Sequence, residues 1–307
     1  MFPDIDLLLD RRRLKRRLFI WRTLAIAGGV IAVLTGLHAA GLTGRGPHVA
    51  RLTVTGVITD NRKLTAAIRA AGRDPDVRAL IVAINSPGGS VSGGESLHRA
   101  ISIVAEKKPV VAVMGGLAAS AGYMIAMPAH HVFARGSTVT GSIGVLMETG
   151  EVSGLLEKLG VTAEAITSGP LKDQPSLTRK LSPEGRAALR DVIVDMYEQF
   201  VTMVANGRHM DPTAVRALAD GRVYTGRQAL NLGLIDAIGD EQDARLWLEK
   251  TQSIGAGLPV EEITITTLTE RLLVTELTSF FEIMWKTLIS QSLMLDEPRA
   301  VWQPGVP

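Results

Sequence analysis

Two apolar segments, each leading into a pair of glycines, constrain the fold of this chain more than any other feature. "VRALIVAI", Val77–Ile84, is interrupted only by Arg78, and "KPVVAVMGG", Lys108–Gly116, has the same character. Near-continuous apolar runs of this length are typical of strands in a parallel sheet that is covered on both faces. Both segments are therefore predicted to be central strands of such a sheet.

The neighbouring segments alternate between strand and helix patterns. Val49–Ile58 is rich in β-branched residues and predicts a strand, and a helix is expected near Asn61–Ala71. "NSPGGSVSGGE" predicts a turn, followed by a helix through about Val104. "HVFARGSTVTGSIGVLM" predicts short strands and turns, and "EKLGVTAEAITS" the end of a helix followed by a strand. Alternation at this spacing predicts an α/β fold.

The pattern becomes helical from Ser182 onward. Ser182 is placed to cap a helix of six to seven turns with Pro183 in its first turn, and Asp211-Pro212 repeats this start. The C-terminal "TLTERLLVTELTSFFEIMWKTLISQSLMLDEP" has apolar residues at helical spacing but carries more charged residues than is typical of a membrane span. It predicts an amphipathic helix, which either binds a partner subunit or the membrane surface, or caps its own domain.

The segment Thr23–Leu42 contains no charged residue except for the titratable His38, and a basic cluster precedes it. About 20 such residues can span a bilayer as a helix, and the cluster places the N-terminus in the cytoplasm. A cleaved signal peptide and a buried soluble helix are the alternatives. The expected organisation is a basic N-terminus (1–22), a transmembrane anchor (23–42), one large domain (43–250) and a helical C-terminal extension (251–307).

Composition excludes several classes of function. The formal charge is +2 and the pI about 9.0, but "RRRLKRR", Arg11–Arg17, supplies much of the basic excess, which argues against a nucleic-acid surface. The chain has no cysteine, so a thiol nucleophile, a Cys-ligated zinc site and a disulfide are all excluded. Its acidic residues and histidines do not cluster at metal-coordinating spacing, so no metal is expected.

The segment "GGLAASAGYMIAMPAH", Gly115–His130, is small and apolar and predicts a buried helix after the second strand. It contains a single aliphatic hydroxyl, that of Ser120. A serine between a strand and a helix is either an N-cap or a nucleophile, because free backbone N–H groups at a helix start favour negative charge. The glycines of "SPGG", Ser86–Gly89, let backbone amides approach a ligand and form an oxyanion hole near such a serine. The segment lacks the Gly-Lys-Ser/Thr ending of a phosphate-binding loop.

A serine nucleophile needs a base, and none of the six histidines has a neighbourhood that marks it as catalytic. The alternative base is a lysine, whose ordinary pKa of about 10.4 must be lowered by desolvation before it can accept a proton at neutral pH. The candidate is Lys172 in "ITSGPLKDQPS". Taken alone, Lys172 has the pattern of a solvated surface lysine.

Five segments together resemble the signal peptide peptidase A family of serine proteases. They appear in family order between about Val49 and Glu249: "SPGGSVSGGE", "KPVVAVMGGLAASAGYMIA", "TVTGSIGV", "ITSGPLKD" and "GRVYTGRQALNLGLID". The resemblance implies the repeated ββα fold shared by the ClpP protease and the crotonases. It implies a Ser/Lys dyad of Ser120 and Lys172, with Ser142 hydrogen-bonded to the lysine and Gly88 and Gly89 at the oxyanion hole.

The resemblance also implies a function and a place. A membrane-anchored serine endopeptidase of this family degrades remnant signal peptides and other apolar peptides through an acyl-enzyme, without a cofactor. Short members build each active site between two protomers of a homo-oligomer, here expected to be an octamer. The expected location is the bacterial cytoplasmic membrane, with the catalytic domain on the periplasmic or outer side and no nucleic-acid partner.

This sequence departs from the family pattern in two places. Pro170 and Leu171 stand where polar or aromatic residues usually precede the lysine, which puts the conformation of the lysine loop in doubt. His130-His131 replaces a more usual acidic and basic pair.

Three other functions remain open from the sequence. A crotonase acting on acyl-CoA would need neither Ser120 nor Lys172. A stomatin-linked membrane protease or a phage head-maturation protease would use the same dyad. A non-catalytic membrane assembly protein on the same fold would be inert toward serine-reactive probes.

Overall fold

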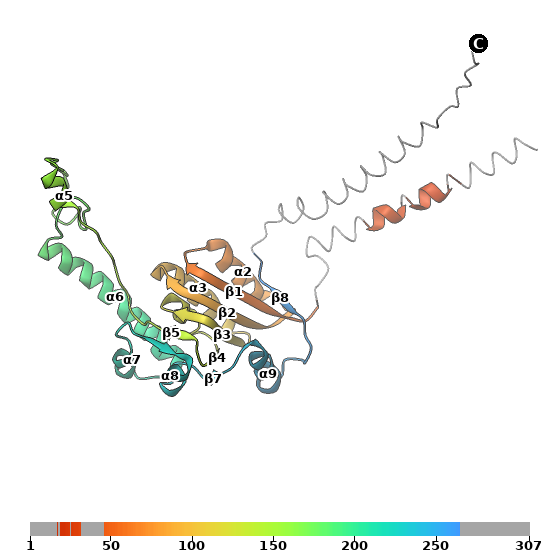
Figure 1. Cartoon of the computed structure of the whole chain (residues 1–307). Helices are drawn as coiled ribbons and strands as arrows, with labels where there is room; N and C mark the ends of the chain where they lie inside the picture. Colours follow the sequence, from red (N-terminus) through yellow and green to blue (C-terminus); the bar gives the residue numbers. More distant parts are fainter. Residues whose placement is uncertain (1–16, 18, 25, 32–45, 265–307) are drawn as a thin grey trace, which may run out of the picture. The chain divides into compact units, whose positions relative to one another are not determined.

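The computed structural model describes residues 17, 19–24, 26–31 and 46–264, in two compact units. One unit, Gly46–Thr264, contains the whole sheet (Figure 1), and the described residues before Gly46 belong to the other. Residues 17, 19–24 and 26–31 are helical and exposed. Within the described ranges no helix combines the length and apolarity needed to cross a bilayer. Much of the expected anchor (23–42) and nearly all of the expected C-terminal helix lie outside those ranges.

An eight-stranded sheet forms the centre of the larger unit. Its order is β6-β5-β3-β2-β1-β8, with β4 pairing with β3 and β7 pairing with β4. All pairs are parallel except β5 with β6. The strands are β1 (His48–Ile58), β2 (Val77–Gly89), β3 (Val110–Ala119), β4 (His131–Ala134), β5 (Val139–Gly141), β6 (Val223–Thr225), β7 (Ala237–Ile238) and β8 (Val260–Glu262). The predicted α/β class is confirmed.

Most helices of residues 46–264 begin at a side chain that caps them. Ser182, Asp211 and Asp240 each accept a hydrogen bond from a backbone amide in the first turn of the helix that follows, as their sequence positions predict for the first two. The helices are α2 (Arg62–Arg73), α3 (Val91–Ala105), α4 (Ala121–Met124), α5 (Ser153–Lys158), α6 (Pro183–Arg208), α7 (Pro212–Leu218), α8 (Gly226–Asn231) and α9 (Glu241–Gln252).

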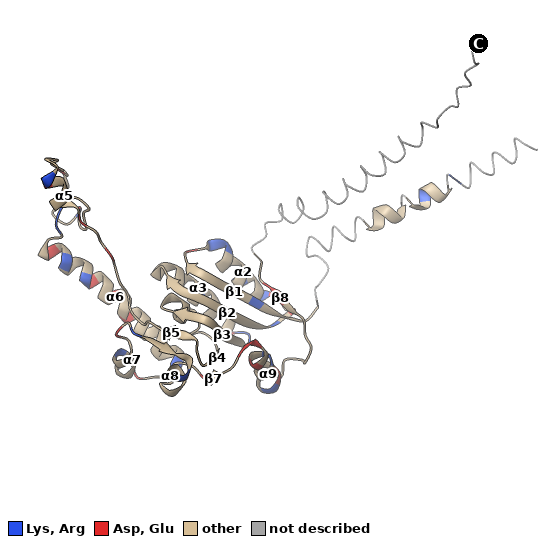
Figure 2. Cartoon of the chain, viewed as in Figure 1, with Lys and Arg blue, Asp and Glu red and all other residues tan. Residues whose placement is uncertain are grey.

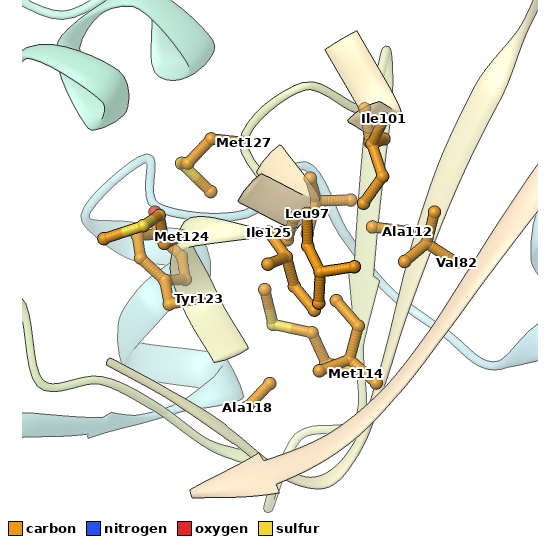
Figure 3. Packing of buried hydrophobic residues seen from close by; sticks show 14 of the residues in the cluster. Val82, Leu97, Ile101, Ala112, Met114, Ala118, Tyr123, Met124, Ile125 and Met127 are labelled. Carbon is orange, nitrogen blue, oxygen red and sulfur yellow. The ribbon is translucent and has the colours of Figure 1, made fainter. Parts of the chain in front are cut away.

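The sheet has an apolar core on each face. On one face, side chains of β2 and β3 pack against Leu97 and Ile101 of α3 and against Tyr123 and the residues that follow it (Figure 3). On the other face, Ala244 and Leu248 of α9 cover residues of β1 to β4. Burying each large aliphatic side chain contributes about 1.5–3 kcal/mol. Ser120 therefore directly follows a strand that is covered by apolar side chains on both faces of the sheet.

The structure corrects three local predictions. The segment Asn85–Gly89 is not a turn but the end of β2, because it continues to pair with β1 through Val57–Gly88 and Ile58–Gly89. The expected long helix after Gly116 is also wrong: β3 runs on to Ala119, and only Ala121–Met124 is helical, followed by turns. Residues 161–168 contain no strand.

Candidate active site

Ser120 lies at a sharp turn between β3 and α4. Its backbone has φ 53° and ψ −121°, in the region that side chains other than glycine rarely adopt. Such a conformation costs of order 1–3 kcal/mol and is concentrated at functional sites. A strained serine on a strand-to-helix turn is also how α/β-hydrolases expose their nucleophile. The backbone at Ser120 is thus held in a form that stability alone does not favour.

The side chain of Ser120 does not cap α4. Ser120 occupies the N-cap position, yet its hydroxyl accepts no hydrogen bond from the helix. Its backbone carbonyl instead accepts from the amides of Tyr123 and Met124, both at 2.9 Å. The hydroxyl, on a half-buried residue, is therefore left available for another role.

The "SPGG" segment packs directly against Ser120. Gly88 has φ 109°, and a Cβ there would lie 2.8 Å from Ser120 Cβ and 3.2 Å from the amide nitrogen of Ala121. At Gly89 a Cβ would meet the carbonyl oxygen of Ile58 at 1.9 Å. Both positions therefore require glycine for this close approach. The structure brings Gly88, one of the two predicted oxyanion glycines, into contact with the predicted nucleophile.

Two residues at this contact were not singled out by the sequence. Ser86 is fully buried, and its Oγ accepts a hydrogen bond of 3.0 Å from the Gly88 amide. That amide is thus already occupied in the structure. Ala121 directly follows the serine, and its amide is at the first position of α4, where no intrahelical acceptor exists. The residue after a nucleophilic serine commonly supplies an oxyanion-hole amide, which is the signal that would have identified Ala121.

Ser142 follows the strand that pairs with the end of β3. Gly141 accepts a 2.9 Å hydrogen bond from the Ser120 amide, and Ser142 itself has a positive φ of 49°. The Ser142 amide donates to the carbonyl of Arg222 at 2.8 Å. Because β2, β3 and β5 are parallel, their carboxyl ends meet at one edge of the sheet, and this places the residues of all three ends together.

Lys172 is not brought to Ser120 within one chain. It lies in a turn between α5 and α6, where its amide donates to the carbonyl of Gly169 at 3.1 Å, and its side chain is exposed. Among the described residues no hydrogen bond or ion pair joins Lys172 to Ser120 or Ser142. Figure 1 shows this part of the chain, with α5 and the amino-terminal half of α6, extending away from the sheet. We call residues 145–195 the arm.

Apolar side chains are unusually exposed along the arm. Ile166 is 97% and Leu146 77% exposed. The larger set of exposed apolar residues in the arm includes Leu146, Met147, Leu155, Leu159, Val161, Ile166, Leu177, Val192 and Val194. Soluble monomers rarely expose this much apolar surface in one region, and such regions mark interaction sites.

The described histidines do not replace the lysine. Those for which a hydrogen bond of the ring is found use it elsewhere: His48 Nδ1 with the Gly46 carbonyl and His130 Nδ1 with the Val110 amide. Burial lowers the pKa of His98 to about 4, and this ring lies in a separate pocket with Met127 and Arg208. In residues 46–264 no histidine is hydrogen-bonded to Ser120. The described residues also contain no cluster of side chains that could hold a metal ion.

The chain is similar to known peptidases. Residues 102–255 match the model of peptidase family S49, so the chain is a peptidase by descent. It is 41% identical over 72% of its length to a Synechocystis protein with a provisional protease name, and 41% identical over 58% to Protease 4 of Salmonella typhi. It is also 35% identical over 71% of its length to the chloroplastic serine protease SPPA of Arabidopsis thaliana. The chain belongs to peptidase family S49, and the resemblance to the signal peptide peptidase A family is confirmed.

The matched parts differ greatly as shares of these relatives. They make up 78% of the Synechocystis protein, but 29% of the Salmonella protein and 32% of the Arabidopsis protein. Among solved structures, a mutant of ClpP1 from Listeria monocytogenes is 18% identical, with a TM-score of 0.41, and the similarity covers 63% of this chain and 92% of that one. This similarity is too low to establish a shared fold, and the ClpP/crotonase-like fold stays a prediction.

Proposed function

We propose that this peptidase is a serine endopeptidase in which Ser120 is the nucleophile and Lys172 its base. The observation that carries the proposal is the strained turn at Ser120. The hydroxyl there makes no capping hydrogen bond to α4, and Cβ of Ser120 packs against Gly88. A structural serine would not need this backbone conformation. Family membership supports the proposal, because it assigns the chain to peptidases rather than to acyl-CoA enzymes.

The reaction proceeds in two halves. Neutral Lys172 takes the proton of Ser120 as Oγ attacks the peptide carbonyl carbon, and the carbonyl oxygen becomes an oxyanion. The protonated lysine then gives its proton to the leaving amine, which leaves an acyl group on Oγ. A water molecule, deprotonated by the lysine, then attacks the ester carbonyl carbon. The bond to Oγ breaks, the lysine returns the proton to Ser120 Oγ, and the acid product leaves.

Backbone amides beside Ser120 stabilise the oxyanion. The Ala121 amide, at the first position of α4, has no acceptor within that helix, and the Gly88–Gly89 segment supplies the opposite wall. The Gly88 amide donates to Ser86 Oγ in the free protein, so it must exchange this partner for the oxyanion during the reaction. Preorganised amides of this kind are worth several kcal/mol, about 2.7–4 for one donor.

Lys172 reaches Ser120 from a neighbouring copy of the chain. Two observations support this arrangement: Lys172 is exposed and has no partner in residues 46–264, and the arm that carries it exposes many apolar side chains. Burial at a contact with a second copy would remove water from around the lysine amine, which is the environment that a lysine base needs. Ser142, at the edge of the same site, would accept or donate a hydrogen bond to it. A homo-oligomer, with an octamer as the expected size, follows from this arrangement.

The membrane location and the substrates belong to the same proposal. Residues 23–42 would anchor the chain in the bacterial cytoplasmic membrane, with the peptidase unit on the periplasmic side. Apolar remnants of signal peptides would be the substrates. The small side chains of the "GGLAAS" segment suit small or aliphatic substrate residues, and no metal or cofactor takes part.

Active-site labelling tests the dyad. Detergent-solubilised protein is treated with a fluorophosphonate probe as wild type, Ser120→Ala and Lys172→Ala, and Lys158→Ala serves as control for removing an exposed lysine of the arm. We expect labelling of the wild type and of the control alone. Labelling of Ser120→Ala at the wild-type level would place the nucleophile elsewhere, and an unlabelled wild-type oligomer would support a non-catalytic assembly protein.

A further inference from the structure

A basic groove lies on the outer surface of the peptidase unit, between α2 and α3. Its volume is about 560 Å³. Arg69 and Arg73 of α2 form one wall, and Arg99 and Lys107 lie on the side of α3. Glu95 is the one acidic residue that lines it. Figure 2 shows α2 with basic residues in blue and no acidic residue in red.

The four cations of the groove have no anionic partner in the described part of the chain. All four are exposed, and none of them forms an ion pair or a side-chain hydrogen bond with another described residue. Arg69 and Arg73 are four residues apart on one helix, a spacing at which like charges repel. The charges therefore oppose the stability of their own helix unless an anion from outside the chain binds between them.

The remaining basic residues of α2 add to the positive charge of the groove. Its first turn begins with Arg62 and Lys63 and contains no acidic residue. The amino end of a helix carries a partial positive charge, so cations are least favourable there. A helix selected only for stability would place acidic residues at this end. The basic surface thus extends along the whole length of α2.

The two walls of the groove are held in place by close contacts. Lys108 Nζ donates to the carbonyl of Ala71 at 3.0 Å and to that of Asp74, which ties the end of α3 to the end of α2. At Gly72 a Cβ would lie 3.0 Å from Val104 Cγ2, so the helices touch along their apolar sides. The groove is therefore a formed feature of the fold, and its charges do not depend on mobile loops.

The end of the groove at Arg73 lies near the amino end of β1, where the chain enters the peptidase unit. The first residue of β1, His48, donates its amide to the carbonyl of Asp76, three residues beyond Arg73. In the sequence only residues 43–47 separate the proposed anchor from His48. Five residues span at most about 18 Å. If residues 23–42 cross the bilayer, this edge of the sheet is held within reach of the lipid headgroups.

We propose that the basic groove binds the headgroups of anionic phospholipids and so holds the peptidase unit against the membrane surface. The inference rests on the proposed anchor for its geometry, but the charges of the groove do not depend on the dyad. Phosphodiester groups match arginine well, because the planar guanidinium donates two hydrogen bonds to one phosphate. The basic residues of a membrane-proximal surface contribute additively to this attraction, which salt screens.

A single cysteine placed in this cysteine-free chain gives the test a specific reporter. A spin label is attached to Ser92→Cys, in the groove, or to Gln242→Cys on α9, at the opposite face of the sheet. The full chain is placed in nanodiscs of phosphatidylcholine, with or without phosphatidylglycerol. We expect phosphatidylglycerol to protect the label at position 92, but not at position 242, from a water-soluble relaxant at low salt. High salt should reverse the protection.

Charge-matched variants identify the residues responsible. In Arg69→Gln/Arg73→Gln/Arg99→Gln we expect the ratio of protected to unprotected label to fall about fivefold for each cation removed. Arg227→Gln/Arg245→Gln/Lys250→Gln removes the same charge from other exposed positions and should keep the protection. Equal protection in both lipids, or equal loss in both variants, would overturn the proposal. Protection by an added oligonucleotide but not by phosphatidylglycerol would overturn it in favour of a nucleic-acid partner.

Failure of the anchor is detected separately. Alkaline extraction releases a chain that lacks a membrane span, whatever its groove binds. The released chain is then tested for flotation with phosphatidylglycerol vesicles. If it floats with them and only the groove variant does not, the anchor proposal is wrong and the groove proposal is supported. A chain that resists extraction but shows no lipid-dependent protection would keep the anchor and remove the groove proposal.

Discussion

A methyl group added to Gly88 would lie 2.8 Å from Cβ of Ser120, closer than Cβ atoms approach in proteins. The strained serine and the glycine segment therefore depend on each other for their positions. Gly88 also has φ 109°, so an alanine there is strained even before it meets Ser120. This contact joins the proposed nucleophile to the proposed oxyanion segment.

We expect Gly88→Ala to abolish labelling of Ser120 by a fluorophosphonate and to lower stability by about 1–3 kcal/mol. The matched control is Gly233→Ala, because Gly233 also has a positive φ, 74°, but a Cβ there meets nothing within 4 Å. Gly233→Ala should lower stability but leave the labelling of Ser120 unchanged. Labelling rates and denaturant midpoints measured side by side check both, and equal labelling of the two variants would contradict a role for Gly88 at the site.

Tyr123 is joined to the turn at Ser120, because its amide donates to the Ser120 carbonyl at 2.9 Å. Its ring is fully buried and its hydroxyl donates a 2.7 Å hydrogen bond to the carbonyl of Leu234, while burial raises the pKa of the phenol (Figure 3). Tyr123→Phe leaves that carbonyl without its donor, which should cost about 1–3 kcal/mol.

Chemical denaturation measures this cost. Tyr197 is a suitable comparison because it is half-buried and no hydrogen bond of its hydroxyl is found within the described residues. Tyr197→Phe should stay within about 0.5 kcal/mol of the wild type. If both variants lose the same stability, the hydrogen bond to Leu234 is not what holds Tyr123.

The sheet was predictable because its signal is local. Val77–Ile84 and Lys108–Gly116 are apolar enough to be identified as buried strands, and both are confirmed as parts of β2 and β3. Their ends were not predictable. Pro87 and Gly88 are typical of turns, and pairing with β1, together with the pairing of Ser86 with Ala118 of β3, keeps that segment in the sheet. A partner strand some 30 residues away leaves no mark within the segment itself.

The sequence names the residues of the candidate site, and their catalytic roles stay predictions. The structure brings Gly88 into contact with Ser120 and hydrogen-bonds the Ser120 amide to Gly141, whereas the sequence did not single out Ser86 and Ala121. Ser86 is an ordinary serine by its sequence, and only burial reveals its bond to the Gly88 amide. The position of Lys172 stays a prediction, since a contact between protomers is not a property of one chain.

His98 gives the stability a dependence on acidity. Burial lowers its pKa from 6.5 to about 4, so the folded chain binds this proton less readily than the unfolded chain does. Between these two pKa values the unfolded state holds more protons, and stability therefore falls as the pH is lowered from about 6.5 to about 4. Below that range the loss is complete. The size of the effect is about 3 kcal/mol.

We expect His98→Gln to remove this part of the pH dependence. The variant and the wild type are unfolded by denaturant at several pH values from neutral to acidic. Burial acts to raise the pKa of Asp236, but the hydrogen bonds and charge of Arg208 outweigh it and lower this pKa, so Asp236 also weakens the fold in acid. Carboxylates of this kind act alike in both proteins. The difference between the two curves thus isolates His98, and parallel curves would show that its proton affinity is unchanged by folding.

A site shared between protomers makes a prediction that a site within one chain does not. Ser120→Ala keeps Lys172 and Lys172→Ala keeps Ser120, so a contact between the two variants contains both intact groups. The solubilised variants are mixed, dissociated and reassembled. Each variant alone should be inactive, and the mixture should recover about a quarter of wild-type activity. A quarter is the share of contacts in a heterologous ring that pair an intact Ser120 with an intact Lys172. Mixing two preparations of the same variant controls for the treatment. Activity that stays absent in mixed oligomers, verified by differently tagged subunits, would place the dyad within a single chain and require the arm to fold back toward Ser120.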